Sequence, residues 1–345
     1  MQVPTLHTGT TGGTRWVRRI ISIPLVLAAA MLGLAASPVL VVVAIVFDLL
    51  RKRSGFPTLR CYAFVLWALW LEVCTVLSAM FLAVVFAGRL RSAASLRTHN
   101  AMEQWWVGQL VQAAALTMRL EFAVTCPHHL LSGPVVVIGR HASHADAILP
   151  AWLLGTRNAM NLRYVVTAGL TWGPTFNLYG HRLSNHFVNR GKTHTATDLA
   201  PLANLASSAD AYDAVIIFPE GHLATPERRE RALARITDPV LASRARKLLH
   251  LLPPRPAGTV ALLDAAPHAD VIVINHVGLE RFQTVGAIWR NVPFADPVRV
   301  RIQRVAARDV PRFDNDATIG WLTDTWQDMD EWITANMPEP NDGSR

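Results

Sequence analysis

Two long apolar stretches occupy the first quarter of the chain, which has 345 residues. Residues 20–50 carry no charged side chain except Asp48, and residues 61–88 carry none except Glu72. At about 1.5 Å per residue, a helix over either stretch could cross a hydrocarbon core of about 30 Å. A cleavable signal peptide has a much shorter apolar core. We therefore expect residues 20–97 to form hydrophobic membrane-anchoring helices; the alternative is two helices buried in a protein core.

Basic clusters flank both stretches and bear on their orientation: Arg15, Arg18 and Arg19; Arg51, Lys52, Arg53 and Arg60; Arg89, Arg91 and Arg97. Two simple crossings would place the middle cluster on the wrong side for the positive-inside rule. If Ser37-Pro38 instead breaks the first stretch, and both stretches dip into the membrane and return, all three clusters stay cytosolic. Both arrangements put the chain after residue 90 on the side of the N-terminus, so we expect a domain on the cytosolic face of the inner membrane.

The rest of the chain alternates between short β-type runs and helical stretches, the mark of an α/β domain. Residues 98–118 have apolar side chains at helical spacing, which fits either an interfacial helix or core packing. The predicted strands are Leu120–Val124, Val135–Gly139, Leu162–Val166, His186–Asn189, Ala214–Phe218, Asp270–Asn275 and Val298–Arg304. The predicted helices are Ala145–Leu154, Thr195–Ser208, Pro226–Arg235, Thr259–Ala266 and Ile319–Asn336. We expect this domain to span residues 98–337, between a disordered basic N-terminus (residues 1–19) with its anchor and a flexible tail (residues 338–345).

Composition adds a preference for anionic partners. The formal net charge is +8, and 51% of the residues are hydrophobic. Because the basic residues flank apolar stretches rather than forming one stripe, we expect an anionic membrane face or phosphate-bearing substrates, and no nucleic acid partner. The 3 cysteines show no metal-ligand spacing and cannot make a disulfide framework, which favours reducing, cytosol-facing surroundings.

The first candidate for chemistry is the pair His141 and Asp146. The apolar run 135–139 ends in Gly139 and delivers His141 to a loop at the carboxyl edge of a strand, where active sites of open α/β sheets form. If the loop through Ser143 folds back, the Asp146 carboxylate can fix one imidazole nitrogen and leave the other free to take a proton from a hydroxyl. The alternative is an Asp146 that only caps a helix, with His141 as a surface residue.

Two further strand ends carry polar side chains. Phe218-Pro219-Glu220-Gly221 follows a buried strand, so that Glu220 reaches the same sheet edge, where it can bind substrate hydroxyls or organise nearby basic groups. The other strand end is Asn189-Arg190-Gly191-Lys192, in which Arg190 can grip a phosphate with two hydrogen bonds and Lys192 adds a point charge. Each segment alone would more often be a solvated strand end.

Together these three segments resemble the phospholipid and glycerol acyltransferase family, whose bacterial members acylate 1-acylglycerol-3-phosphate. The family's His-x4-Asp motif matches His141 to Asp146. Its second motif matches Phe187–Arg190, and its third, Phe-Pro-Glu-Gly, matches Phe218–Gly221 in full. Order and spacing agree over roughly residues 115–280, and an N-terminal hydrophobic anchor is usual in the family.

The resemblance implies a glycerolipid-acyltransferase-like mixed sheet flanked by helices, and a specific reaction. His141 would be the general base on the acceptor hydroxyl, and Asp146 would orient it. The acceptor oxygen would attack an acyl-CoA or acyl-carrier-protein thioester directly, in phospholipid biosynthesis, with no metal or cofactor beyond this co-substrate. The implied substrate-binding residues are Arg190 for the acceptor phosphate and its neighbours Asn189 and Lys192, with Phe218, Pro219, Glu220 and Gly221 lining the acceptor pocket.

Several positions depart from the family pattern. His222 follows Gly221 where Thr or Ser is usual, and no Arg comes directly after it; Arg228 and Arg229 are candidates to substitute. Arg140 precedes the base where Asn is typical, and the fourth motif is only approximate at Val271–His276. These changes leave the acceptor open, including another lysolipid or a glycolipid.

Two alternatives to an acyltransferase are an enzyme of another class and a protein without catalytic activity. A metal-dependent hydrolase could use ligands among His141, His144, Asp146, His181 and His186, but the spacing fits no established ligand pattern and leaves Phe218–Gly221 unexplained. A non-catalytic lipid-binding membrane protein could retain the same fold, although every chemical group that the reaction needs is present.

Overall fold

The structure is a computed structural model that describes residues 12–126, 133–188 and 196–337. Its centre is a sheet of seven strands in the order β1-β7-β6-β2-β5-β3-β4, which confirms all seven predicted strands. Their bounds are β1 (Phe122–Thr125), β2 (Val135–Gly139), β3 (Asn161–Thr167), β4 (His186–Val188), β5 (Asp213–Ile217), β6 (Asp270–Val277) and β7 (Val298–Val305). All neighbouring strands are parallel except the antiparallel pair β6 and β7.

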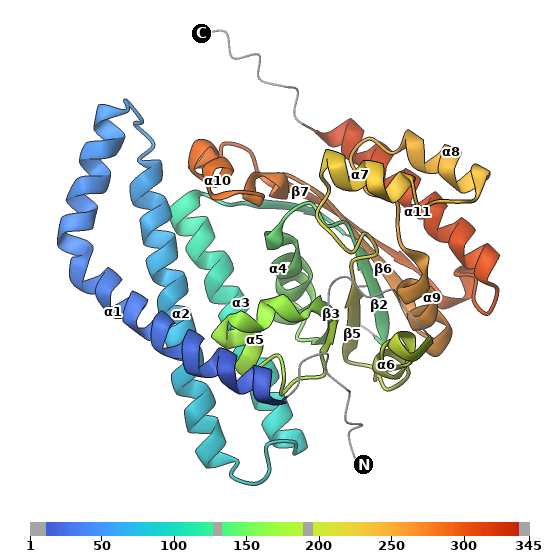
Figure 1. Cartoon of the computed structure of the whole chain (residues 1–345), viewed down its shortest axis with the longest axis horizontal. Helices are drawn as coiled ribbons and strands as arrows, with labels where there is room; N and C mark the ends of the chain where they lie inside the picture. The colour runs from blue at the N-terminus through green and yellow to red at the C-terminus, as the bar shows by residue number, and fades with distance from the viewer. Residues whose placement is uncertain (1–11, 127–132, 189–195, 338–345) are drawn as a thin grey trace.

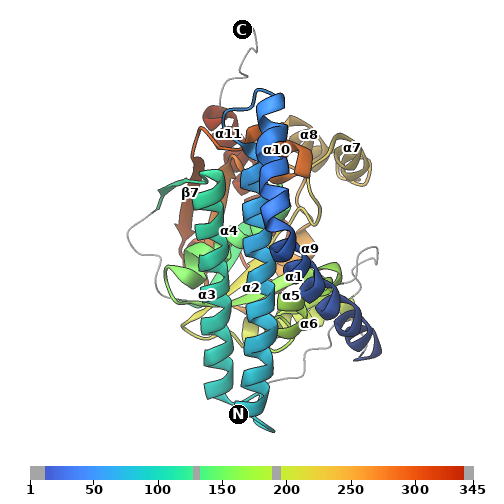
Figure 2. The same ribbon diagram turned by 90° about the vertical axis from the view of Figure 1, so that its left-hand side faces the viewer.

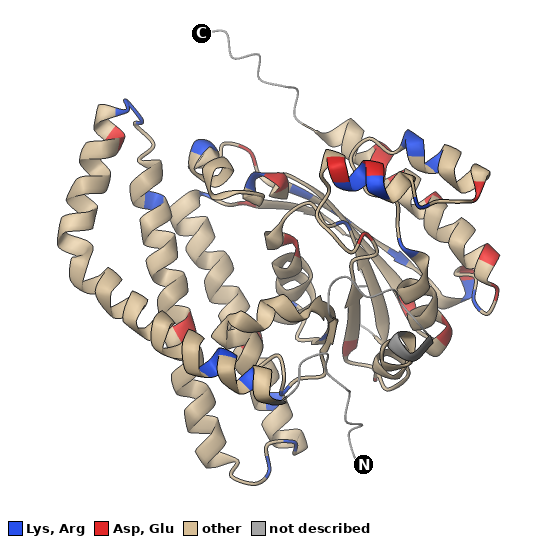
Figure 3. Ribbon diagram, in the orientation of Figure 1, with Lys and Arg blue, Asp and Glu red and all other residues tan. Residues whose placement is uncertain are grey.

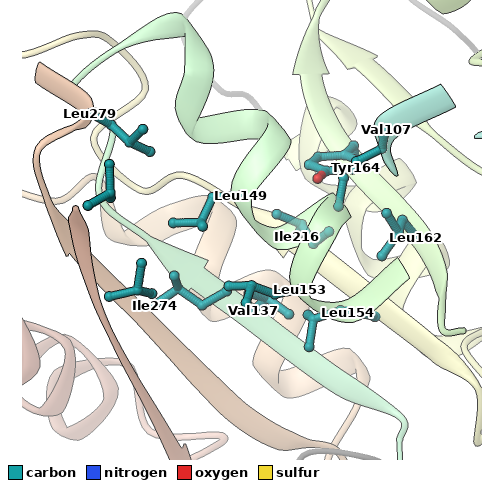
Figure 4. Packing of buried hydrophobic residues seen from close by; sticks show 14 of the residues in the cluster. Val107, Val137, Leu149, Leu153, Leu154, Leu162, Tyr164, Ile216, Ile274 and Leu279 are labelled. Atoms are coloured by element: carbon teal, nitrogen blue, oxygen red, sulfur yellow. The ribbon is translucent and has the colours of Figure 1, made fainter. Parts of the chain in front are cut away.

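Helices cover both faces of this sheet, which explains why its central strands are apolar throughout. Alternate residues of a strand point to opposite faces. On one face, Val135 and Val137 pack with α3 and with a helical segment over residues 144–156; Figure 4 shows part of this cluster. On the other, Val136 and Ile138 pack with α6, α9 and α11 (Figure 1). The helices are α3 (Ala93–Met118), α4 (Ile148–Pro150), α5 (Pro174–Leu178), α6 (Ala196–Ser207), α7 (Pro226–Leu233), α8 (Pro239–Lys247), α9 (Pro256–Ala265), α10 (Val285–Asn291) and α11 (Asn315–Asn336).

Helices α5, α8 and α10 were not predicted from the sequence. Each is short: the longest, α8, has 9 residues, too few for a clear helical pattern. The start of α8 is nevertheless encoded locally, because Asp238 accepts hydrogen bonds from Val240 N and Leu241 N. The predicted helix Ala145–Leu154 is present but irregular: a 3-10 turn precedes α4, and a π-type turn follows it.

Two long helices, α1 (Gly12–Leu50) and α2 (Pro57–Val85), precede the α/β domain. Helix α1 contains Pro24 and Pro38, and Figure 1 shows that it is bent. One expectation is corrected here: the segment 1–19 is not disordered throughout, because α1 begins at Gly12. Helix α1 also continues past Ser37-Pro38, where one of the two arrangements considered above assumed a break. Residues 1–11 and the predicted tail (338–345) lie outside the described residues.

Both ends of α1 contact the α/β domain. Near its start, Nη1 of Arg18 donates to the carbonyl of Ala168 over 2.6 Å. After its end, Nη2 of Arg53 donates to the carbonyl of Arg290 in α10 over 2.9 Å. Helices α1 and α2 therefore lie alongside the domain (Figure 2) instead of projecting from it.

Both helices are long and apolar enough to cross a membrane. Much of their apolar surface is exposed, including Leu25 at 66% and Leu32 at 69% on α1, and Phe81 at 66% on α2. Exposed apolar surface of this extent marks an interaction site. The helices therefore form a candidate membrane anchor.

Candidate active site

The structure brings His141 and Asp146 together at the carboxyl edge of β2. Nδ1 of His141 lies 3.4 Å from Oδ2 of Asp146, an ion-pair distance. The Asp146 side chain is 1% exposed and the His141 side chain 21% exposed. The carboxylate is thus shielded while the imidazole still reaches the surface, as the predicted acid–base pair requires.

The loop between them is held by Ser143. The Ser143 N–H donates to Oδ2 of Asp146 over 2.6 Å, and its hydroxyl donates to Oδ1 over 2.9 Å. Burial alone would raise the pKa of the Asp146 carboxyl, but His276, His141 and the Ser143 N–H outweigh it and hold this pKa well below its usual range. Ser143, not Asp146, is the N-cap of the turn, and Asp146 is its third residue, which accepts from the Ser143 N–H. The Asp146 carboxylate is therefore the ionised partner of His141 and does not only cap a helix.

A second imidazole, His276, contacts the same carboxylate. Its Nε2 lies 3.3 Å from Oδ1 of Asp146, and its side chain is 2% exposed. His276 lies in β6, whose Ile274 pairs with Gly139 of β2. In the sequence, His276 stands out only as part of an approximate motif, because the apolar run before it does not reveal which strand lies beside β2.

Glu220 supports the backbone of His141. Its Oε1 accepts a hydrogen bond from the N–H of His141 over 2.8 Å, and its Oε2 accepts one from the N–H of Leu252 over 3.1 Å. Glu220 is 2% exposed, and this burial raises its pKa to about 7 against the opposing effect of those hydrogen bonds. Its carboxylate therefore contacts the main chain of His141, whereas the sequence had suggested binding of substrate hydroxyls or organisation of nearby basic groups.

The remaining residues of the Phe-Pro-Glu-Gly turn surround this contact. The rings of Phe218 and His141 lie with centroids 5.1 Å apart. Pro219 offers its carbonyl to the N–H of Arg255 over 2.9 Å. Gly221 has φ of +69°, a left-handed conformation that a residue without a Cβ adopts readily.

Arg140, which replaces the family's usual Asn, ties β2 to β6. Its Nη1 donates to the carbonyl of His276 over 2.6 Å and to Oε1 of Glu280 over 2.5 Å, and the side chain is 3% exposed. Burial would raise the pKa of Glu280, but Arg140 and His276 lower it below its usual value. Arg140 therefore fixes the segment that carries His276 against the catalytic loop, and is not a free cation for substrate.

The structure describes only some of the other residues that the sequence suggested for substrate binding. Asn189, Arg190 and Lys192 lie outside the described residues, directly after β4. The candidate substitutes for the missing arginine make local contacts, because Arg228 donates to the carbonyl of Leu223 and Arg229 to that of Arg246. Within the described ranges, no three His, Cys, Asp or Glu side chains are grouped as a metal site.

The geometry suits proton transfer at one imidazole nitrogen. Since Nδ1 of His141 faces Asp146, Nε2 is the nitrogen available to a substrate hydroxyl. A neutral His141 can accept that proton, and the buried carboxylate stabilises the resulting imidazolium. The site can therefore act as a general base.

Comparison with known proteins identifies a family that part of the chain matches. Residues 121–252 match the model of the Acyltransferase family, and this segment contains His141, Asp146 and Glu220. The match confirms the acyltransferase resemblance seen in the sequence. Among solved structures, the chain is similar to the crystal structure of the 1-acyl-sn-glycerophosphate acyltransferase of Thermotoga maritima, with 12% identity, a TM-score of 0.43, and coverage of 78% of this chain and 98% of that one.

Proposed function

We propose that the protein is a membrane-bound O-acyltransferase that moves a fatty acyl group from a thioester to the hydroxyl of a lysophospholipid. The observation that carries this proposal is the contact of His141 Nδ1 with the buried Asp146 carboxylate, inside the segment that matches the Acyltransferase family. The pair supplies the base that an alcohol needs in order to attack a thioester.

In the proposed reaction, the acceptor hydroxyl gives its proton to Nε2 of His141 while its oxygen bonds to the thioester carbonyl carbon. Asp146 stabilises the imidazolium that forms. The carbon–sulfur bond then breaks, and the thiolate leaving group takes the proton back from His141. The enzyme thus ends each cycle with a neutral imidazole, and the acyl-CoA or acyl-carrier-protein donor is a co-substrate.

The proposed acceptor is 1-acylglycerol-3-phosphate, which would give phosphatidic acid in phospholipid biosynthesis. The net charge of +8 favours a phosphate-bearing substrate. Arg190, which matches the family's second motif, is the residue proposed from the sequence to bind that phosphate, together with Lys192.

We further propose that α1 and α2 hold the enzyme on the cytosolic face of the membrane. Figure 3 shows basic residues at the start of α1 and at the turn between α1 and α2, with a long uncharged span between them. Because both ends of α1 contact the α/β domain, an α1 that crossed the bilayer would draw part of this domain into the hydrocarbon. An α1 embedded in one leaflet avoids that cost and keeps both basic ends among lipid headgroups.

The function is tested by assaying the purified protein in detergent or vesicles with acyl-CoA and acyl-carrier-protein donors. The acceptors are 1-acylglycerol-3-phosphate, glycerol 3-phosphate and neutral lysolipids. We expect His141→Ala to abolish transfer while membrane association is retained. The matched control is His268→Ala, since His268 is exposed and precedes β6 at the opposite edge of the sheet. Turnover retained in His141→Ala would remove the proposed base.

A further inference from the structure

A proline-rich loop is hydrogen-bonded to the turn that supports His141. The N–H of Leu252 donates to Oε2 of Glu220 over 3.1 Å, and the N–H of Arg255 donates to the carbonyl of Pro219 over 2.9 Å. Leu252 and Glu220 are 32 residues apart in the chain. Prolines at 253, 254 and 256 restrict the backbone on both sides of Arg255, so the loop presents this side chain from a stiff support.

The side chain of Arg255 lies over Gly221. A Cβ on Gly221 would sit 3.6 Å from both Cδ and Nη1 of Arg255. The N–H of Gly221 donates to the carbonyl of Phe218 over 3.0 Å, so the turn keeps the two α-carbons within about 7 Å. Phe218 in turn stacks near His141. The Arg255 guanidinium is therefore at the catalytic edge of the sheet.

The charge of Arg255 is not neutralised within the described part of the chain. There its guanidinium has no hydrogen bond and no ion pair, and the charged group that acts on it is another cation, Arg235. Partial burial and then repulsion by Arg235 lower the pKa of Arg255. Arg228 and Arg229 differ, because backbone carbonyls already occupy their guanidinium groups. Two neighbouring cations without an acidic partner are an arrangement that a bound anion would stabilise.

We propose that Arg255, with Arg235 behind it, contributes to binding the phosphate of the acyl acceptor, for which the sequence alone had suggested Arg190 and Lys192. The proposal rests on the proposed function, which supplies a phosphorylated acceptor. It also accounts for the arginine missing directly after Gly221: a distant loop returns a guanidinium to the same turn. An arginine fork grips a phosphate with two parallel hydrogen bonds. Arg255 is thus a specificity-determining residue that favours phosphorylated over neutral acceptors.

The test compares wild type, Arg255→Ala and Arg255→Lys with 1-acylglycerol-3-phosphate and with a monoacylglycerol that lacks the phosphate. We expect Arg255→Ala to raise the KM for the phosphorylated acceptor by roughly tenfold to a hundredfold, as for other hydrogen bonds to charged groups. The KM for the monoacylglycerol and for the donor should stay within about twofold, and Arg255→Lys should recover part of the loss. Arg246→Ala is the matched control, an exposed arginine of the neighbouring helix α8.

Three results would overturn the proposal: an unchanged KM in Arg255→Ala, an equal loss with both acceptors, or a rise confined to the KM of the donor. Equilibrium titration of glycerol 3-phosphate into wild type and Arg255→Ala separates this inference from the proposed function. Weaker binding by the variant supports the phosphate site even if the wild type transfers no acyl group. Equal binding by both proteins contradicts it.

Discussion

Nε2 of His276 lies 3.3 Å from Oδ1 of Asp146, while Oδ2 of the same carboxylate faces His141. The two imidazoles thus occupy different oxygens of one buried carboxylate. A carboxylate that can rotate about its last bond presents a less constant partner to the base. Ser143 holds both oxygens by hydrogen bonds, and His276 adds a contact that restricts this rotation further. We infer that His276 is a positioning residue that acts on the base through Asp146.

Replacing His276 tests this role. His276→Ala should lower kcat about tenfold, since one contact of about 1–1.5 kcal/mol corresponds to that factor. The KM values for donor and acceptor should change little, because the His276 side chain is only 2% exposed. His276→Gln, which keeps an N–H donor, should recover part of kcat. Steady-state kinetics check both variants, and a rise in KM at unchanged kcat would contradict the positioning role.

The central parts of this site could be predicted from the sequence because they are local. The apolar runs before Gly139 and Phe218 identify buried strands, and the chemistry follows directly after each of them. Parallel pairing of Ile138 with Ile217 then brings the two strand ends together, as expected for neighbouring strands of an α/β sheet.

What the sequence could not predict depends on contacts between distant segments. The order of strands places His276 beside Asp146, and no local pattern encodes that order. Arg255 reaches Gly221 only because the loop after α8 folds back onto the turn, and α8 itself is too short to recognise. The backbone contacts of Glu220 were not foreseen for a related reason: its two hydrogen-bond donors are the N–H groups of His141 and Leu252, which residue type does not reveal.

Glu220 predicts a dependence of stability on pH. Burial raises its pKa to about 7 from an ordinary value of 4.5, so the folded protein holds this proton more tightly than the unfolded chain. Its contribution to stability is therefore fully present below pH 4.5 and lost as the pH rises through 7. Between these values, wild type should lose about 3 kcal/mol relative to Glu220→Gln, which does not titrate. Unfolding of both proteins in detergent over this pH range measures the difference, and parallel stability curves would contradict the assignment.

The ion pair of Arg140 and Glu280 predicts a second effect on stability. The Arg140 side chain is 3% exposed, and Glu280→Ala would leave its charge buried without an acidic partner. Removing one member of a buried pair costs about 3–5 kcal/mol, and the partial exposure of Glu280, 24%, places the expected loss near the lower value. Unfolding measurements check this, with Asp324→Ala as the control: its carboxylate pairs with Arg244 but is 71% exposed. Equal losses in the two variants would show that burial of Arg140 does not set the cost.

The exposed apolar face of α1 predicts which surface of the protein binds the membrane. Leu25 and Leu32 are 66% and 69% exposed, and a charge placed at each would have to enter the hydrocarbon at about 2–3 kcal/mol. Leu25→Glu with Leu32→Glu should therefore release the protein from vesicles in a flotation assay. Tyr212→Glu is the control, because Tyr212 is 71% exposed on the α/β domain, and this variant should still float. Unchanged flotation of the double variant would contradict membrane contact through this face.

The turn between α1 and α2 distinguishes an α1 embedded in one leaflet from an α1 that crosses the bilayer. Ser54 is exposed in this turn, close to the contact of Arg53 with α10. If α1 lies within the cytosolic leaflet, Ser54→Cys should react with a membrane-impermeant thiol reagent only after the cells are opened, because the turn and the α/β domain share one side. A crossing α1 would expose the new thiol on intact cells. The wild type, with its 3 cysteines, gives the background labelling. Labelling of intact cells above that background would show that the contacts of α1 with the α/β domain do not persist in the membrane.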